Sequence, residues 1–346
     1  MLNSGRLERL QVGLEEPLLV TGATNVGYLV GFESTNAALL VERERVRLFA
    51  DARYALAGRA VADVEFVETG RILLADLATR LSGAIAFEED HMNYAGYRAL
   101  ASGGLELVPR RGLVEALRSV KDESELAAIA VASLIADRAL GTLASESWLG
   151  RSERQLGRRL RGLVLELGGD DVAFDVIVGS GPNGALPHAR PGEREIEDGD
   201  LVVVDFGVLL DGYRSDCART VAVGAPDSRL EEIVEVCLSA HETAMARIAP
   251  GMTGVEADAV ARSLITEAGY GEQFGHGLGH GIGRDVHEAP FLSPISDDVL
   301  VVGQVLTIEP GIYLGGLGGV RIEDLCVVRE HGLESLTSLP KRLSSG

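Results

Sequence analysis

The first third of the chain alternates short apolar runs with segments of helical periodicity. Runs of Leu, Val, Ile and Phe predict strands, and the amphipathic patterns between them predict helices at 51–60, 71–81 and 91–101. The predicted strands are Leu18–Gly22, Tyr28–Phe32, Ala37–Glu42, Val46–Ala50 and Ala84–Phe87. This alternation is typical of a small α/β domain.

The pattern changes near residues 111–121, and we therefore predict two domains, residues 1–118 and 119–346. Acidic residues at 122–125 open a long helix, because negative charge in a first turn favours the helix dipole, and its nearly all-apolar surface predicts burial. Ser152 is expected to cap a second helix. Residues 173–178 predict a strand, and helices are expected at 227–248 and 253–268.

Composition is that of an ordinary globular protein, with 46% hydrophobic and 24% charged residues in 346. No apolar run approaches the roughly 20 residues that span a bilayer, and the start lacks the apolar core of a signal peptide. Three cysteines fit reduced thiols, so we expect a cytoplasmic protein. The net charge of −20 argues against nucleic acid and against anionic membrane surfaces as partners.

The stretch LVVVDFGVLLDGYRSD (201–216) places Asp205 in an apolar run and Asp216 eleven residues later. Burying a carboxylate is costly unless a cation or a metal accompanies it. Asp211-Gly212 predicts the turn of a β-hairpin, which would bring the two carboxylates side by side, where they repel unless positive charge lies between them. For either carboxylate alone, a structural ion pair is the competing interpretation.

Three later residues complete a candidate metal site. His280 lies in GHGLGHGIG, Glu309 precedes a Pro-Gly turn, and Glu323 lies in VRIED. Four carboxylates and one imidazole favour Mn²⁺, Co²⁺ or Zn²⁺, and suit two ions about 3.5–4 Å apart that activate a bridging water. The glycines around His280 would let backbone pack close to the site.

Two other motifs were weighed against this interpretation. Asp205-Phe-Gly matches a kinase metal motif, but the other kinase segments are missing. The Gly-rich segment around His280 lacks the Gly-Lys-Ser/Thr ending of a phosphate-binding loop. Neither a kinase nor a phosphate-loop protein is therefore favoured.

Taken together, the motifs resemble the metallopeptidases of the pita-bread fold, in the branch of Xaa-Pro aminopeptidases and prolidases. The matching segments are the two aspartates eleven residues apart, GHGIG with its His280 seven residues before the VHE histidine His287, TIEPGIY, VRIED and NGALPH. YLVGFESTNAALLVE and LFADARYALAGRA resemble a creatinase-like N-terminal domain. The resemblance implies an α+β protein, with a pita-bread catalytic domain preceded by a smaller α/β creatinase-like domain.

The resemblance also implies roles for individual residues. His188 and His287 would hold the substrate carbonyl and stabilise the oxyanion, and Glu309 would be the general base. His276, Tyr313 and Arg321 would bind or orient the substrate. The implied ligands of two divalent ions, with Mn²⁺ preferred and Co²⁺ or Zn²⁺ as alternatives, are Asp205, Asp216, His280, Glu309 and Glu323.

Two departures from the family pattern bear on function. Ala218 stands where relatives have a threonine whose hydroxyl could hydrogen-bond a ligand carboxylate. Phe291 stands where many relatives, prolidases included, have an arginine that could meet a substrate carboxylate.

We therefore expect a metal-dependent exopeptidase that hydrolyses the Xaa-Pro bond at the N-terminus of short peptides with proline second, through a hydroxide activated by two metals. A strict Xaa-Pro dipeptidase is the main alternative, and a binding or non-peptidase relative is a further one, disfavoured because all five ligands are present. The expected assembly is a homodimer.

Overall fold

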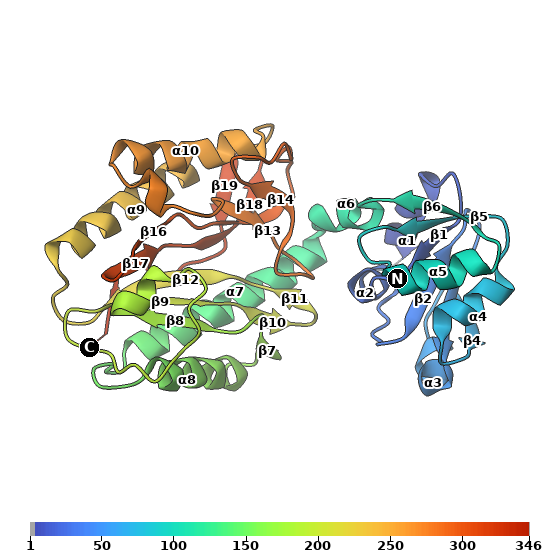
Figure 1. Ribbon diagram of the computed structural model, residues 1–346, viewed down its shortest axis with the longest axis horizontal. Helices are drawn as coiled ribbons and strands as arrows, with labels where there is room; N and C mark the ends of the chain where they lie inside the picture. The colour runs from blue at the N-terminus through green and yellow to red at the C-terminus, as the bar shows by residue number, and fades with distance from the viewer. Residues whose placement is uncertain (1–3, 346) are drawn as a thin grey trace. The chain divides into compact units, whose positions relative to one another are not determined.

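The computed structural model describes residues 4–345, and the chain forms two compact units, Met1–Arg118 and Ser119–Gly346 (Figure 1). The first unit is an α/β sheet domain, and the second mixes several antiparallel sheets with two pairs of helices. This is the predicted fold class.

Unit 1 contains one six-stranded mixed sheet in the order β4-β3-β2-β1-β5-β6. Strands β1, β5 and β6 run parallel, as do β3 and β4, while β2 is antiparallel to both of its neighbours. The strands are β1 (Leu18–Val20), β2 (Ala37–Val41), β3 (Val46–Asp51), β4 (Glu65–Thr69), β5 (Ala84–Glu88) and β6 (Glu106–Arg110).

The helices of unit 1 correct one prediction. Residues 28–32, predicted as a strand, lie mostly in helix α2 (Ala23–Val30), which ends at Gly31 in the left-handed conformation (φ 67°) that glycine adopts without strain. The apolar run was long enough to read as a strand but packs as a buried helix. The other helices are α1 (Ser4–Val12), η1 (Ala52–Tyr54), α3 (Ala55–Gly58), α4 (Leu73–Arg80), α5 (Tyr94–Ser102) and α6 (Leu113–Ser119).

Unit 2 is built from two helix pairs that cover β-sheets, seen in Figure 1 as α7 and α8 on one side and α9 and α10 on the other. Asp122 caps α7, Ser152 caps α8, Asp227 caps α9 and Thr253 caps α10. The sequence predicted a helix start near each of these residues, and a cap at Ser152. The helices are α7 (Glu123–Ala144), α8 (Glu153–Glu166), η2 (Gly181–Ala185), α9 (Ser228–Arg247), α10 (Gly254–Glu267) and η3 (Gly271–Gln273).

The strands of unit 2 form sheets in the orders β20-β12-β9-β8, β14-β13-β15-β18-β19, β11-β10-β7 and β16-β17. The strand predicted at 173–178 is only partly correct. Residues 177 and 178 belong to β8, whereas residues 173–176 lie between the end of β7 and the start of β8. The strands are β7 (Asp171–Val172), β8 (Ile177–Ser180), β9 (Leu201–Phe206), β10 (Val208–Leu210), β11 (Tyr213–Arg214), β12 (Cys217–Ala222), β13 (Gly279–Gly281), β14 (Glu288–Leu292), β15 (Val305–Ile308), β16 (Gly311–Leu314), β17 (Gly318–Arg321), β18 (Asp324–Arg329), β19 (Gly332–Ser335) and β20 (Leu343–Ser344).

Two apolar clusters hold these layers together. One joins α7 and α8 to β8, β9 and β12, and the other joins α9 and α10 to β15, β17 and β18. Each helix pair thus buries its apolar face against its own sheet, and the polar chemistry is left to the space between the sheets.

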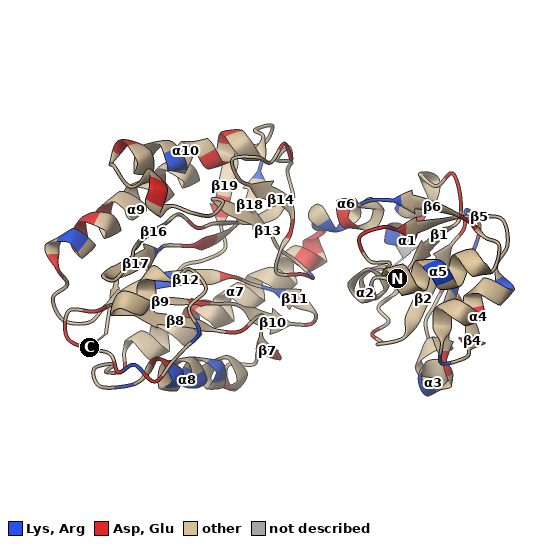
Figure 2. Ribbon diagram, in the orientation of Figure 1, with Lys and Arg blue, Asp and Glu red and all other residues tan. Residues whose placement is uncertain are grey.

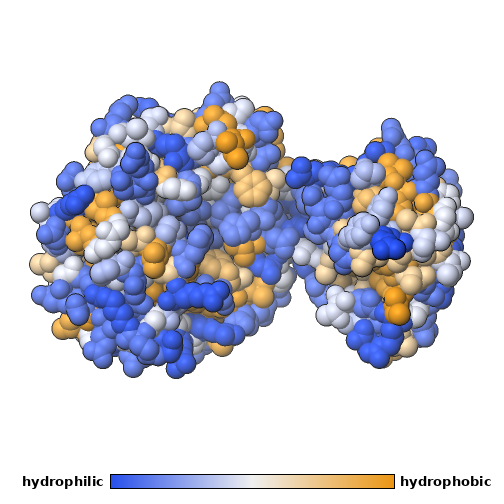
Figure 3. Space-filling view, viewed as in Figure 1, coloured by the Kyte–Doolittle hydropathy of each residue, from blue (hydrophilic) through white to orange (hydrophobic). Residues whose placement is uncertain are grey.

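Helix α7 is long and apolar enough to cross a membrane by length and composition, although no run of about 20 consecutive apolar residues was expected in this sequence. More than half (56%) of its most apolar window is buried inside the structure, as in the core helix of a globular unit. The face of the molecule in Figure 3 is mainly hydrophilic with scattered apolar side chains.

Basic side chains gather on α8 (Figure 2). Three of them are ion-paired: Arg154 pairs with Glu193, Arg159 Nε lies 2.9 Å from Glu146 Oε1, and Arg161 Nη2 lies 2.8 Å from Asp171 Oδ2. These pairs are partly or largely exposed, as expected for a solvated helix face.

A polar network joins the carboxyl end of β5 to α2 and α6 in unit 1. The Glu88 carboxylate accepts hydrogen bonds from the backbone N–H groups of Thr21 and Gly22 and from the Asn25 amide. His91 Nε2 lies 2.7 Å from Glu115 Oε1. The hydrogen bond with Glu115 raises the pKa of His91, while burial opposes it.

Because the folded pKa of His91 is raised, its stabilising contribution is present below about pH 6.5 and is lost as the pH rises through the folded value. We expect about 0.2–1 kcal/mol, the usual range for a partly exposed pair. NMR titration should give a His91 pKa above 6.5 in the natural protein and a lower one in Glu115→Gln. Equal values in the two proteins would contradict the assignment.

Candidate metal centre

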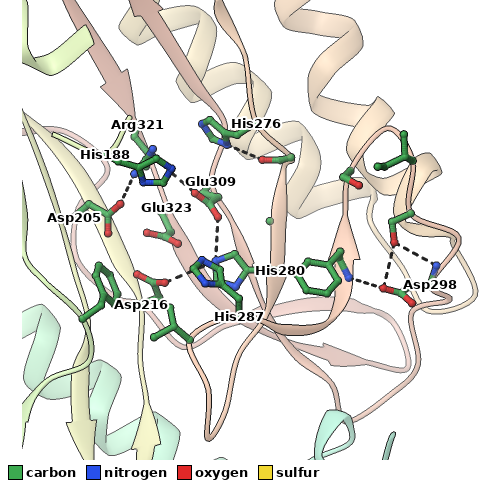
Figure 4. A pocket seen from close by; sticks show the side chains of 18 of the residues that line it. His188, Asp205, Asp216, His276, His280, His287, Asp298, Glu309, Arg321 and Glu323 are labelled. Atoms are coloured by element: carbon green, nitrogen blue, oxygen red, sulfur yellow. Dashed lines mark hydrogen bonds and ion pairs between the residues drawn. The ribbon is translucent and has the colours of Figure 1, made fainter. Parts of the chain in front are cut away.

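The predicted site residues of unit 2 converge on a cavity of about 850 Å³. It lies between the sheet that contains β9 and β12 and the sheet that contains β13 and β15. Figure 4 shows the labelled side chains pointing into it from different strands and loops. The predicted residues that line the cavity are His188, Asp205, Asp216, His276, His280, His287, Glu309, Arg321 and Glu323. Tyr313 is not part of the lining but contacts two of these residues.

The hairpin of β9 to β12 presents both aspartates on one face. Asp205 pairs with Ala218 across the sheet, so Asp216, two residues before Ala218, projects to the same side. The turn is at Asp211 and Gly212, both with positive φ, as predicted. A Cβ at Gly207 would lie 1.9 Å from the carbonyl oxygen of Ser215, so this close approach requires glycine.

The opposite sheet supplies the other three candidate ligands. His280 lies in β13 at an irregularity in its pairing with β14, the kind of bulge that re-aims a side chain beside a site. Its Nδ1 lies 3.0 Å from the Gly281 carbonyl oxygen, which leaves Nε2 facing the cavity. Glu309 directly follows β15, and Glu323 directly precedes β18.

The buried oxygens of this cluster fit a metal. Asp205 Oδ1, Asp216 Oδ1 and Glu323 Oε2 are buried and have no hydrogen-bond partner within the described chain. Ligand atoms of Asp216, His280 and Glu323 lie within 4.8 Å of one another. A buried carboxylate oxygen without a partner is costly, and a divalent cation would satisfy it.

The pKa shifts of the cluster also reflect the cost of burying several carboxylates together. Burial, and then the charge of Asp205, raise the pKa of Asp216 well above its usual range; burial, and then Asp216, do the same for Glu323. Burial would also raise the pKa of Glu309, but the hydrogen bond with His280 and the charges of His280 and Arg321 together outweigh burial and lower that pKa. A metal would require deprotonated ligands, so its binding would release protons.

Arg321 organises the side of the cavity near Asp205. Its guanidinium is buried, forms an ion pair with Asp205 and donates to the Tyr313 hydroxyl at 2.9 Å. The same hydroxyl lies 2.9 Å from His276 Nε2. Tyr313 and Arg321 therefore hold His276 and Asp205 in fixed orientations.

His188 and His287 line the cavity but lie outside the carboxylate cluster. The rings of His287 and His280 are 4.4 Å apart between centroids, in an edge-on arrangement. Glu288, next to His287, accepts a hydrogen bond from the buried Lys121 at 2.7 Å. Burial lowers the pKa of His287, which favours the neutral ring.

Ala218 and Phe291, the two departures from the family pattern, both lie at the site. Ala218 is fully buried opposite Asp205, so no hydroxyl reaches that carboxylate from this position. Phe291 lines the cavity and is 43% exposed.

Sequence reasoning missed Thr307. Its hydroxyl accepts from the His280 backbone N–H at 3.1 Å and donates to Glu309 Oε1 at 3.2 Å. Thr307 lies two residues before Glu309, and the period of two in a strand could have found it. The loop 293–298, which also lines the cavity, carries no local signal that would have marked it.

Comparisons with known proteins agree with this geometry. Residues 127–330 match the model of metallopeptidase family M24, and residues 6–120 match the creatinase/prolidase N-terminal domain. A protein of Pyrococcus furiosus named Xaa-Pro dipeptidase is 42% identical over 231 residues, 67% of this chain and 66% of its own length.

Solved structures cover nearly the whole chain. A Bacillus anthracis protein described as an Xaa-Pro dipeptidase is 38% identical, with a TM-score of 0.93 over 98% of this chain and 99% of its own. A Thermotoga maritima structure described as an X-Pro aminopeptidase is 34% identical, with a TM-score of 0.88 and the same coverage. The expected catalytic fold and the expected N-terminal domain are thus confirmed.

Two glycines in one motif give a matched test of the site. A Cβ at Gly279 would lie 1.9 Å from the Thr307 carbonyl oxygen, whereas a Cβ at Gly275 meets nothing within 4 Å. Gly279→Ala should push β13 from β15, displace His280, and cost about 1–3 kcal/mol, the usual range for overpacking. Metal content after dialysis and thermal unfolding should change in Gly279→Ala but not in Gly275→Ala. Full metal content in Gly279→Ala would contradict the predicted role of this close contact.

Proposed function

Because this chain belongs to metallopeptidase family M24 and carries a creatinase/prolidase N-terminal domain, we propose that it is a metal-dependent Xaa-Pro dipeptidase, a prolidase. The observation that carries the proposal is the group of buried carboxylate oxygens without partners that face His280. The relatives named Xaa-Pro dipeptidase support the dipeptide as substrate, in place of the longer peptides expected from the sequence.

The residues around the cavity have different roles in the proposed hydrolysis. Bound divalent ions would lower the pKa of a water and polarise the scissile carbonyl. Glu309, whose carboxylate lies 3.3 Å from His280 Nε2 in the cavity, accepts a proton from the attacking water. His188 and His287 donate hydrogen bonds to the carbonyl oxygen as negative charge develops on it.

The substrate is oriented from the other side of the cavity. His276, fixed by Tyr313, faces the departing part of the peptide. Arg321 keeps the Asp205 carboxylate in place for metal binding. The proposal extends to two ions per site, with Mn²⁺ preferred over Co²⁺ and Zn²⁺, and to a cytoplasmic homodimer.

One observation favours a second candidate, an Xaa-Pro aminopeptidase that acts on longer peptides. A free carboxylate after the proline needs a cationic partner to offset its lost hydration. Among the described residues that line the cavity, Arg321 is the only arginine or lysine, and it is already bonded to Asp205 and Tyr313. Phe291 offers an apolar ring instead, next to which a neutral amide would cost less.

Metal removal and a matched pair of substrates test the proposal. After chelation verified by metal analysis, hydrolysis of Ala-Pro should cease, and it should return with Mn²⁺, at two ions per chain, and to a lesser extent with Co²⁺ or Zn²⁺. A dipeptidase should show a higher kcat/KM for Ala-Pro than for Ala-Pro-Ala, and Ala-Ala should be a poor substrate.

A higher kcat/KM for Ala-Pro-Ala than for Ala-Pro would instead identify the protein as an Xaa-Pro aminopeptidase. In that case Phe291→Arg should raise the activity on Ala-Pro. Full hydrolysis by a metal-free protein would overturn the metallopeptidase proposal itself.

The two histidines should act on the transition state rather than on the metal. His188→Ala and His287→Ala should each lower kcat by about 10²–10³, the usual scale for one lost oxyanion donor, with metal content unchanged. His331→Ala is the control, because His331 is exposed and outside the cavity. A variant that loses its metal would move that histidine into the ligand set.

A further inference from the structure

A buried carboxylate outside the cavity contacts the loop that carries His188. Glu153 is the first residue of α8, and its side chain has no solvent exposure. An ionised carboxylate at such a position must be satisfied by hydrogen bonds, and the N-terminus of the helix adds favourable electrostatics.

The hydrogen bonds to the Glu153 carboxylate all come from one loop. Its Oε1 accepts from the backbone N–H and the hydroxyl of Ser180, both at 2.8 Å, and from the Asn183 amide at 3.0 Å. Its Oε2 accepts from the backbone N–H of Gly192 at 2.9 Å. Ser180 and Asn183 precede His188 and Gly192 follows it, so one carboxylate joins both ends of the loop.

The loop is confined elsewhere as well. A Cβ at Gly179 would lie 2.8 Å from the Asn183 carbonyl oxygen, so the loop folds closely onto the end of β8. At its tip, the Pro187 carbonyl oxygen accepts a hydrogen bond from Arg321 Nη2 at 3.1 Å. His188 thus follows a residue fixed to the metal side of the cavity, while the base of its loop is fixed by Glu153.

We propose that Glu153 is a positioning residue for catalysis, which sets the place of His188 by holding both ends of the loop 180–192. This inference rests on the proposed role of His188. Glu153 does not touch the cavity, and it acts only through the loop. A misplacement of a catalytic group by about 1 Å can cost 10²-fold in rate.

The test is a double-mutant cycle with Glu153→Gln and His188→Ala. The amide keeps the shape of the carboxylate but places an N–H₂ group against donors, so one end of the loop loses its acceptor. We expect Glu153→Gln to lower kcat about 10- to 100-fold with KM and metal content unchanged. In the His188→Ala background the same substitution should change kcat by less than about twofold.

A role in stability alone would give a different pattern. The fold-losses in kcat from Glu153→Gln and His188→Ala would then multiply in the double variant, or metal content and activity would fall together in Glu153→Gln. Either result would overturn the proposal. Glu166→Gln, at the exposed end of the same helix, is the control and should leave kcat unchanged.

If the Glu153→Gln variant does not fold, Asn183→Ala can be used in its place. It removes one of the donors to Glu153 and should give a smaller loss of kcat that also disappears in the His188→Ala background. If His188→Ala alone leaves kcat unchanged while other metal-site variants are inactive, the role of His188 fails, and the positioning proposal with it. If His188→Ala is impaired but the cycle is additive, only the positioning proposal fails.

Discussion

The burial of several carboxylates in one cavity is the constraint on which the rest of the second unit depends. Asp216 and Glu323 have raised pKa values because they have lost hydration and because like charges surround them. Arg321 and His280 offset part of this charge, yet three carboxylate oxygens keep no hydrogen-bond partner among the described residues. Such an arrangement is stable only if apolar packing elsewhere outweighs it, which the two helix-covered sheets provide.

Close backbone packing is the second requirement. The ligands come from two sheets, and side chains as short as aspartate reach a shared point only where strands approach closely. Gly207 allows this within the hairpin of the two aspartates, and Gly279 allows it within the sheet of His280, because a Cβ at either position would lie 1.9 Å from a neighbouring carbonyl oxygen. The irregular pairing at His280 then turns the imidazole toward the carboxylates.

The remaining residues of the site are held indirectly. Thr307 links His280 to Glu309, Tyr313 links Arg321 to His276, and Glu153 binds the loop of His188. Catalysis of the proposed kind needs fixed donors and acceptors more than it needs additional groups, since preorganised dipoles lose no energy to rearrangement during the reaction. The substrate end of the cavity is different, because Phe291 is partly exposed and offers only apolar contact.

Local sequence determined the starts of the long helices, the turn at Asp211-Gly212 and the spacing of the candidate ligands, because capping, positive φ and strand period are properties of neighbouring residues. It failed at residues 28–32, where an apolar run fits a strand or a buried helix equally well and tertiary packing chose α2. The pairing of Arg321 with Asp205, 116 residues apart, the partnerless oxygens beside His280 and the contacts of Glu153 with its loop were decided by the tertiary structure alone, because they depend on how distant segments pack and not on any local pattern.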